Sequence, residues 1–488
     1  MNIFKSKKRG LRSFRNAIVL FIIILIVPLI ILFFARVFFS APPIYPKYEE
    51  LVKRAKSSEN GYIFFKGAKN LAKMMHCGYF SSTTWKIMLS DKPEGFHFDE
   101  DVFRLERWDE FTYFNYYKFL VKRNLFGEEM EAYFNKRYSI TGPTNFHERS
   151  CIYPGENWVQ DFLRNSQGIL DNIKKARQKD FFLPYENISG YIRPEMIMDY
   201  SLLLIELVNV VLLIQKGDYP SALDWIDSFN QIALLMEPLF LWGPSLVAQQ
   251  LSVISIVASY PPLTEPFYED LLCLLTEFKE KIKSIDFNTV YQNALFYFED
   301  SFVQRQNQLM YSPPYYSIPN SISMFFAYNE ISRMLDKHRE VFTTATWKDI
   351  EDAILYNKGK VYSSMVSIKT IKKRSSVGSN EYWMFWSGEK FKNLLLRYNS
   401  ALCSIYGTIL IVLLEQYYKQ NGVYPDDRDN FMKDYFTEEE IIWMNDYLDI
   451  SLSPEKYFID YYPIPKRERD THKSDIFQYR KTYRLYAY

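Results

Sequence analysis

Cysteine is the residue type in this sequence that could most directly bind a metal ion. There are four, Cys77, Cys151, Cys273 and Cys403, and none has the close spacing to another cysteine or to a second histidine that zinc sites require. His76 precedes Cys77 directly, but adjacent side chains on a helix point apart and chelate poorly. We therefore expect no metal site and no other cofactor.

Disulfide formation is the second chemistry open to these thiols. Cys77 and Cys151 are the first pair to test, because both lie in less apolar surroundings and a location outside the cytoplasm would permit the bond. Cys273 and Cys403 instead lie inside apolar helical runs, where a thiol is usually a small core residue. The sequence leaves open whether any disulfide forms.

Histidines and carboxylates could supply general acid or base catalysis, but they form no recognisable catalytic motif. The histidines are dispersed along the chain, at His76, His97, His147, His338 and His472. No G-x-S-x-G sequence marks a nucleophilic serine. One dense group of carboxylates is more typical of a solvated helix face than of a catalytic pair: Asp99, Glu100, Asp101, Glu106, Asp109 and Glu110. We therefore assign no catalytic residue.

Composition argues against nucleotide and nucleic-acid binding. Glycine is scarce, with 17 residues in 488, and neither G-x-G-x-x-G nor G-x-x-x-x-G-K-[ST] occurs. The formal net charge of +1 gives no field that would attract a nucleic acid. Aromatic residues make up 18% of the chain, which fits core filling or, alternatively, a surface for glycans or protein partners.

An uninterrupted apolar run near the start of the sequence predicts a membrane-spanning helix. Residues 17–35 read AIVLFIIILIVPLIILFFA, and about 19 uncharged residues suffice to cross a hydrocarbon core of roughly 30 Å. We place the span at residues 17–39, with the lipid bilayer as its partner. Pro28 lies near its middle and predicts a kink, which a membrane helix tolerates.

The charges on either side of this span predict its orientation. Residues 1–16 contain six basic and no acidic side chains, whereas the first stretch after the span is mixed in charge. We therefore expect a basic cytoplasmic tail, with the bulk of the chain in the periplasm or at the cell surface. A cleaved signal peptide is the alternative, but the apolar run is too long for one. Residues 40–58, with Pro42, Pro43 and Pro46, are expected to form a stiff spacer.

Two later stretches, Pro238 to Thr264 and Tyr398 to Leu414, are also free of charged residues. Both carry polar groups near their middle, among them Gln250 in the first and Ser404 and Thr408 in the second. We interpret both as helices buried in a globular core, with membrane crossing as the alternative.

Residues 59–358 show the 3.6-residue period of helices packed as hairpins, and the predicted fold class is therefore mainly α. The segment from Ile197 to Glu237 reads as two antiparallel helices. Gly217 would end the first helix, Tyr219 would wedge at the turn, and Ala222 would let the second helix pack closely. This hairpin resembles a tetratricopeptide-type repeat, from which Glu206 and Val210 depart.

Residues 359–386 change character and predict a loop or linker. The stretch is polar and basic, with Lys369, Lys372, Lys373 and Arg374 followed by serines and a glycine. A patch for lipid headgroups or nucleic acid is the alternative interpretation of these four cations.

Residues 387–488 predict a long helix followed by a small α+β element. The helix ends at Gly422, whose left-handed conformation would stop it, and Tyr424-Pro425 would fix an extended exit. A capping box from Thr437 to Glu440 starts another helix. The alternating sequences YFIDYYPI and IFQYRKTYRLYAY then predict a short β-hairpin.

The run RYNSALCSIYGTILIVLLEQYYKQNGVYPDD resembles a motif of a broad group of uncharacterised membrane-anchored bacterial proteins, in which the N-terminal span and the KGDY-type hairpin also occur. In that group a C-terminal helix leads into G-x-Y-P and then into an aromatic strand pair. The residues that fit are Arg397, Ala401, Tyr417, Gly422, Tyr424 and Pro425. The Pro-Asp-Pro element of the group is replaced here by Phe458 to Tyr461. The resemblance implies a fold and a location, and no activity.

Together these observations predict a single-pass membrane protein whose extracytoplasmic helical domain is an interaction or scaffold module with a protein partner. An envelope enzyme that hydrolyses glycan or peptide is the alternative, and it would need a cleft lined by two carboxylates about 5–10 Å apart. A component of a secretion or pilus-like assembly is a further alternative, because a similar G-x-Y-P passage follows the N-terminal helix of secretion pseudopilins.

Overall fold

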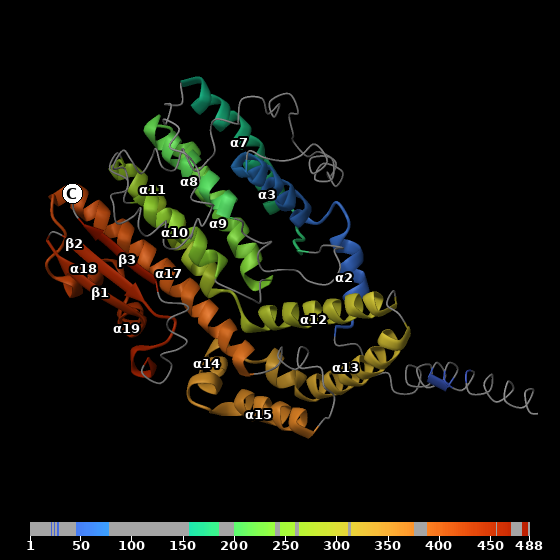
Figure 1. The fold of residues 1–488 in the computed structure, drawn as a ribbon. Helices are drawn as coiled ribbons and strands as arrows, with labels where there is room; N and C mark the ends of the chain where they lie inside the picture. The colour runs from blue at the N-terminus through green and yellow to red at the C-terminus, as the bar shows by residue number, and fades with distance from the viewer. Residues whose placement is uncertain are drawn as a thin grey trace, which may run out of the picture. The chain divides into compact units, whose positions relative to one another are not determined.

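The computed structural model describes residues 21, 24, 27–28, 45–77, 156–184, 200–239, 245–258, 263–310, 314–374, 388–454, 456–469 and 481–486. They belong to two compact units, which we describe separately. Unit 1 comprises Met1–Tyr48, Asn187–Tyr191 and Tyr291–Lys392, and unit 2 comprises Glu49–Glu186, Ile192–Val290 and Asn393–Tyr488. Helices dominate the described residues of both units, as the mainly α prediction requires (Figure 1).

The predicted membrane span lies largely outside the described residues. Of residues 17–39, only four are described, and these are helical. Three of them, Phe21, Ile24 and Val27, follow one another at three-residue intervals and are 66%, 63% and 41% exposed. The predicted cytoplasmic tail at residues 1–16 lies wholly outside the described residues.

Part of the predicted spacer at residues 40–58 is a helix, α2 (Tyr48–Ala55). The sequence YEELVKRA has two glutamates in its first turn and two basic residues in its last turn. This arrangement stabilises a helix through its macrodipole and through pairs of charges one turn apart.

Unit 2 is built from helices that pack in consecutive pairs. They are α3 (Gly61–Cys77), α7 (Glu156–Arg177), α8 (Tyr200–Gln215), α9 (Tyr219–Met236), α10 (Leu246–Ala258) and α11 (Glu265–Lys283). One continuous apolar core joins these helices to the C-terminal elements of the unit. Surface ion pairs add to this packing, as between Arg177 on α7 and Asp227 on α9 at 2.7 Å.

The turn between α8 and α9 has the geometry that its sequence predicts. Gly217 has a φ of +74°, in the left-handed region that favours glycine. The N–H of Asp218 donates to the carbonyl of Leu213 and the N–H of Gly217 to that of Ile214, each at 2.9 Å, which is a Schellman motif. Asp218 then caps α9 by accepting from the N–H of Ser221. These bonds fix two consecutive helices in a hairpin.

Helix α17 (Gly388–Asn421) is packed on two sides within unit 2. On one side, Ser255 Oγ of α10 lies 3.1 Å from Thr408 Oγ1. On the other side, Ser404 Oγ donates to the Tyr461 hydroxyl of the sheet at 2.8 Å. Among the described residues, Phe391–Asn421 is the one helix long and apolar enough to cross a membrane, yet 89% of its apolar window is buried in the protein. The prediction of a buried helix at Tyr398 to Leu414 is confirmed, because a helix covered on both sides is apolar around its circumference.

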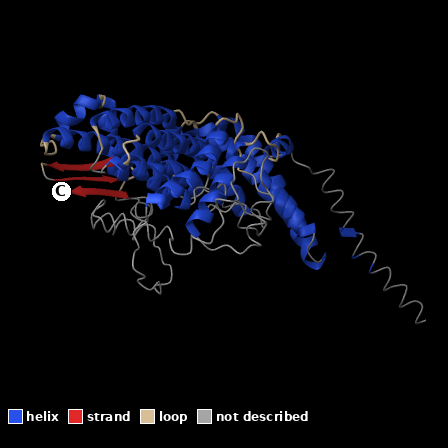
Figure 2. Ribbon diagram, turned by 90° about the horizontal axis from the view of Figure 1, so that it is seen from above, coloured by secondary structure: helices blue, strands red, loops and turns tan. Residues whose placement is uncertain are grey.

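The C-terminal part of unit 2 is a small α+β element. It contains α18 (Arg428–Tyr435), α19 (Glu438–Tyr447), β1 (Leu448–Ser453), β2 (Lys456–Tyr461), η4 (Lys466–Glu468) and β3 (Lys481–Tyr486). The three strands lie side by side in the order β1-β2-β3, and both pairs are antiparallel (Figure 2). The predicted hairpin is the β2–β3 pair. The sequence interpretation missed β1.

Unit 1 contains most of α12 (Phe287–Met310), together with α13 (Pro314–Thr343), α14 (Trp347–Leu355) and α15 (Gly359–Arg374). Stacked aromatic rings form part of its core, with the Phe342 centroid 5.4 Å from that of Tyr291 and 5.2 Å from that of Phe391. Phe302 and Tyr328 stack at 4.0 Å, and the Tyr328 hydroxyl donates to the Glu299 carboxylate at 2.8 Å.

Helix α15 corrects the prediction of a loop or linker at residues 359–386 for residues 359–374. Gly359, the first residue of the helix, has a φ of +86°, in the left-handed region that favours glycine. Val361 and Met365, one turn apart, are buried. The cations that made this stretch look like a loop lie toward the end of the helix, where positive charge is favourable.

Candidate functional site

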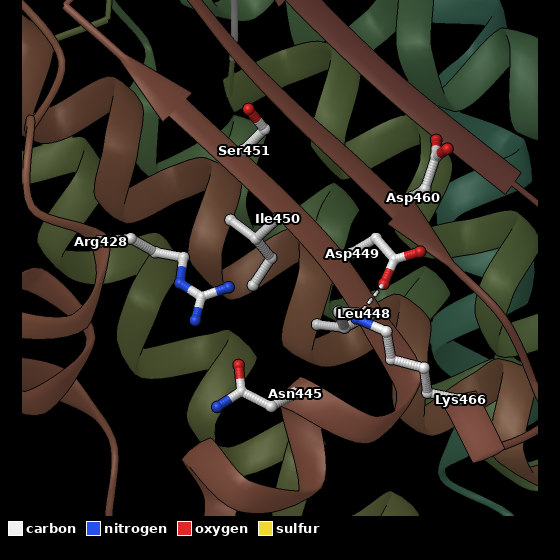
Figure 3. Close-up of a pocket in the computed structure, with 8 residues that line it drawn as sticks. All are labelled: Arg428, Asn445, Leu448, Asp449, Ile450, Ser451, Asp460 and Lys466. Atoms are coloured by element: carbon white, nitrogen blue, oxygen red, sulfur yellow. Dashed lines mark ion pairs between the residues drawn. The ribbon is translucent and has the colours of Figure 1, made fainter.

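A pocket of about 580 Å³ lies beside strand β1 in unit 2 (Figure 3). Its volume falls in the range of known ligand sites, but its lining is more polar than theirs usually are. The residues that line it are Arg428, Asn445, Leu448, Asp449, Ile450, Ser451, Asp460 and Lys466. They come from α18, α19, β1, β2 and η4, so five of the six parts of the α+β element contribute to the site, and β3 does not.

Helix caps position the two side chains on the far side of β1. Arg428 is the first residue of α18, whose N-cap Asp427 accepts a hydrogen bond from the N–H of Asn430 at 3.1 Å. Asn445 lies near the end of α19, which passes directly into β1 without a loop. Figure 3 shows Arg428 and Asn445 on one side of β1 and Asp460 on the other. The pocket therefore extends along the outer edge of β1.

The hydrogen-bond ladder determines which backbone groups of β1 face the pocket. The N–H of Tyr462 donates to the carbonyl of Tyr447 at 2.9 Å. Because antiparallel pairing alternates, Asp449 and Ser451 also direct their backbone groups toward β2, while Ile450 and Leu452 direct theirs outward. The N–H of Leu448 fits this alternation, because it donates to the carbonyl of Met444 in α19 and not to β2. No hydrogen bond from the described residues reaches the outward groups of Ile450 and Leu452.

The charges around the pocket differ in how firmly they are paired. Asp449 Oδ2 accepts from Arg469 Nη1 at 2.7 Å, and the Arg469 guanidinium in turn lies 3.8 Å above the Tyr462 ring. Lys466 Nζ lies 3.9 Å from Asp449 Oδ1, and its side chain is 69% exposed. Arg428 contacts the adjacent and exposed Asp429 at 2.8 Å. Lys466 thus offers a cation that is only weakly held.

Asp449 and Asp460 lie directly opposite each other in the β1–β2 register, and both line the pocket. Directly opposite residues have Cβ atoms about 4.5–5.5 Å apart, so the two side chains are neighbours on one face of the sheet, as a carboxylate pair requires. Asp449, however, has both of its oxygens near a cation. Both oxygens are therefore already engaged by cations of the protein.

Glu440 holds α19 against its neighbouring helices. It also forms the capping box with Thr437 that the sequence predicted. Its Oε1 accepts hydrogen bonds from Lys279 at 2.8 Å, from Tyr406 at 3.0 Å and from Lys283 at 3.2 Å. Burial acts to raise the pKa of Glu440, but the hydrogen bonds from Lys279, the Thr437 backbone and Lys283 outweigh it and lower the pKa to about 2. One carboxylate thereby ties α19 to α11 and α17.

The G-x-Y-P residues form a second polar cluster at the end of α17. Gly422 has a φ of +72°, and its N–H donates to the Tyr418 carbonyl at 2.7 Å. The buried Tyr424 ring lies 4.7 Å from that of Tyr418 and donates its hydroxyl to Glu415 at 3.1 Å, while Pro425 is also buried. The ring therefore covers the end of α17.

Glu415 lies buried between two tyrosines, and its burial alters its pKa. The Tyr457 hydroxyl donates to the same Oε1 atom as Tyr424, at 2.9 Å. Burial raises the pKa of Glu415 to about 7, against the effect of these two hydrogen bonds. No sequence pattern marked Glu415, because Tyr457 lies 42 residues away in the chain.

The predicted motif residues of the α8–α9 hairpin, Tyr219 and Ala222, take part in helix packing. Ala222 is fully buried in α9, where a larger side chain would separate the helices. Tyr219 is half-buried at the start of the helix, and its ring lies 5.5 Å from that of Phe267. These two residues and Gly217 lie on elements other than those that line the pocket.

The thiols and histidines fall only partly within the described residues. Cys403 is buried, as predicted, but Cys273 is exposed because it lies on the outward face of α11. The side chains of Cys77 and Cys151, the first pair to test for a disulfide, lie outside the described residues, as do His97, His147, His472 and the acidic group at residues 99–110. His338 Nδ1 lies 3.1 Å from Ser364 Oγ in unit 1, but Ser364 is buried.

Within the part of the chain that the structure describes, no group of three or more histidine, cysteine or acidic residues could hold a metal ion. The pocket beside β1 is a polar hollow along an open sheet edge. Comparison with protein families, with curated proteins and with solved structures finds no match to the chain.

Proposed function

We propose that this protein is anchored in a membrane by one helix at residues 17–39 and presents a mainly helical interaction module outside the cytoplasm. The observation that carries the proposal is the exposure of Phe21, Ile24 and Val27 on helical backbone. Large apolar side chains at three-residue intervals are costly in water and favourable in lipid. The basic residues 1–16 support a cytoplasmic N-terminus.

The interaction role rests on the nature of the pocket. An open strand edge is a template for pairing with another chain, and native proteins usually cover or charge such edges. Here the edge of β1 borders a hollow with cations at its rim. The hairpin of α8 and α9 and the resemblance at Arg397, Gly422 and Tyr424 belong to the same proposal, because both occur in the group of membrane-anchored proteins that the sequence resembles.

The anchoring is tested in cells that express the full chain with a phosphatase reporter fused after Tyr488. We expect the wild type to stay in the membrane after alkaline carbonate extraction and the reporter to be active outside the cytoplasm. A variant with Ile24→Lys and Val27→Lys should be extracted, whereas Lys53→Gln on the exposed face of α2 is the matched control. A reporter active only in the cell interior would overturn the proposal.

The interaction role is tested by placing a photo-activated cross-linking residue at exposed positions of unit 2. Suitable sites are Ser451 beside the pocket and Glu277 and Glu439 elsewhere. We expect at least one site to give a discrete adduct with another protein in intact membranes. A full scan that yields no adduct beyond that of the anchor segment alone would count against an interaction module.

An envelope hydrolase remains a second candidate, because Asp449 and Asp460 line one pocket at a suitable spacing. Its test is the release of soluble fragments from purified envelope glycan and peptide by the detergent-solubilised protein. Activity that is lost in both Asp449→Asn and Asp460→Asn would establish this function instead. Equal release by the wild type and both variants would dismiss it.

A further inference from the structure

We propose that β1 binds an extended peptide segment of a partner protein, which adds to the sheet as a fourth strand and places an acidic side chain against Lys466 and Arg428. This inference deepens the proposed interaction module and rests on it. It is carried by three features of unit 2: the outward backbone groups of β1, the pocket along them, and the charges at the rim of the pocket.

The backbone groups supply the pairing. Ile450 and Leu452 each direct one N–H and one carbonyl away from β2, and the described residues provide no partner for these groups. A strand that lies about 4.8 Å from β1 would pair with all four groups. Main-chain hydrogen bonds of this kind provide the affinity in strand addition, and side-chain pockets provide the specificity.

The walls of the pocket favour a single strand as the occupant. Arg428 of α18 and Asn445 of α19 line the hollow on the side away from β2 (Figure 3). A second copy that paired through its own β1 would bring its own α18 and α19 to the same edge. An isolated peptide strand carries no such helices, so it fits between β1 and the wall.

The rim defines the chemistry of the peptide. Arg469 already pairs with Asp449 at 2.7 Å, so the exposed Lys466 has little of its charge compensated. Asp429, the partner of Arg428, is itself exposed, and a ligand carboxylate can compete for that guanidinium. On α19, Ile442 lies one turn before Asn445 and is 62% exposed, which offers an apolar contact beside the edge. An alternating peptide with one acidic residue matches these groups.

The test uses the full-length protein in detergent micelles and fluorescein-labelled octapeptides of alternating valine and threonine. Each peptide carries one glutamate at a different threonine position, and the matched control carries glutamine there. We expect at least one glutamate peptide to bind, as measured by fluorescence anisotropy. Lys466→Gln should weaken its binding about 2–5-fold, as for an exposed ion pair, and should leave binding of the glutamine peptide unchanged. Because Lys466 is exposed, this variant leaves the fold intact.

Backbone methylation of the same peptides separates strand addition from simple charge attraction. N-methyl groups on alternate residues block either the edge that faces β1 or the opposite edge. We expect one methylated series to lose at least 10-fold in affinity and the other to bind within about 3-fold of the parent peptide. Equal binding of both series, or no binding of any peptide, would overturn the inference.

Other outcomes distinguish this inference from the proposed function. Adducts between two copies of this chain from the cross-linker at Ser451, with self-association that peptides do not inhibit, would assign the edge to a second copy and overturn the inference. A partner adduct from Glu277 or Glu439, without peptide binding at β1, would refute the docking site and leave the interaction module standing. Loss of all adducts would refute the module itself.

Discussion

Glu237 and Arg397, 160 residues apart in the sequence, form a buried ion pair in unit 2. The Arg397 Nε atom donates to Glu237 Oε1 at 2.9 Å, and its Nη2 atom donates to the Glu237 carbonyl at 2.8 Å. The other carboxylate oxygen accepts from the N–H groups of Leu246 and Val247, the first two residues of α10. A single carboxylate therefore caps one helix and holds α17 in place.

Removal of Arg397 should destabilise unit 2 strongly. The side chains of Arg397 and Glu237 are 4% and 6% exposed, so Arg397→Met leaves a buried carboxylate without its counter-charge. We expect a loss of about 3–5 kcal/mol in the free energy of unfolding, measured by urea denaturation with tryptophan fluorescence. Arg428→Met, at a partly exposed pair, should cost less than about 1 kcal/mol.

A second substitution checks the cause of that loss. Adding Glu237→Gln to Arg397→Met neutralises the stranded charge but keeps an oxygen for the cap of α10. The double variant should therefore be more stable than the sum of the two single losses predicts. Strict additivity would show that lost packing, rather than the unpaired charge, weakens the protein.

Two glycines at helix ends should resist replacement by alanine, while a third should accept it. Gly217 and Gly422 have φ values of +74° and +72°, and no atom lies within 4 Å of an added Cβ, so the cost is backbone strain alone. Gly217→Ala and Gly422→Ala should each destabilise by about 1–2 kcal/mol. Gly407→Ala, inside α17, meets only Ile459 at 3.9 Å and should stabilise by about 0.5–1 kcal/mol. The measurement is thermal denaturation of the three variants. A melting temperature lower for Gly407→Ala than for the other two variants would contradict this account.

Local signals made parts of the fold predictable. The turn at Gly217, the helix end at Gly422 and the capping box at Thr437 each depend on residues within a few positions of one another. Polar residues in the middle of an apolar run correctly marked α17 as buried, because Thr408 bonds across to α10. These features follow from neighbouring residues and therefore from sequence.

Other features depend on partners that the sequence does not bring together. Nothing near Glu237 points to Arg397, and nothing near Glu440 points to Lys279, 161 residues away. Strand β1 has the alternating sequence LDISLS, but it follows α19 without the turn residues that usually announce a strand. The pocket was missed with it, since the pocket extends along the edge of β1.

Acid should unfold the protein partly through Glu440. The pKa of this carboxyl is lowered to about 2 in the folded protein, below its usual value of about 4.3. Its contribution to stability is therefore complete above about pH 4.5 and is lost as the pH falls toward 2. Glu440→Gln should make the urea midpoint depend less on pH across this window. Glu439→Gln, at an exposed position on the same helix, should leave the pH dependence as in the wild type.

Glu415 should act in the opposite direction and at higher pH. Burial raises its pKa to about 7, so the folded state retains a proton that the unfolded chain has already lost. Stability from this group is fully present below about pH 4.5 and is lost as the pH rises through 7. Glu415→Gln keeps an oxygen for the Tyr424 and Tyr457 hydroxyls and should reduce the decline in urea midpoint between pH 5 and 8. An unchanged decline would show that Glu415 is ionised throughout.

Hydrogen exchange should reveal the open edge of β1 directly. The amides of Asp449 and Ser451 point into the β1–β2 ladder, whereas those of Ile450 and Leu452 point toward the pocket. We expect the first pair to exchange at least about 10-fold more slowly than the second, and Ile459 on the central strand serves as a protected control. Each rate is divided into the intrinsic rate of the same amide in an unstructured peptide, so that an alternation along the four residues reports the direction of each N–H. Uniform protection from Asp449 to Leu452 would mean that another segment already occupies the edge, and no peptide could then bind there.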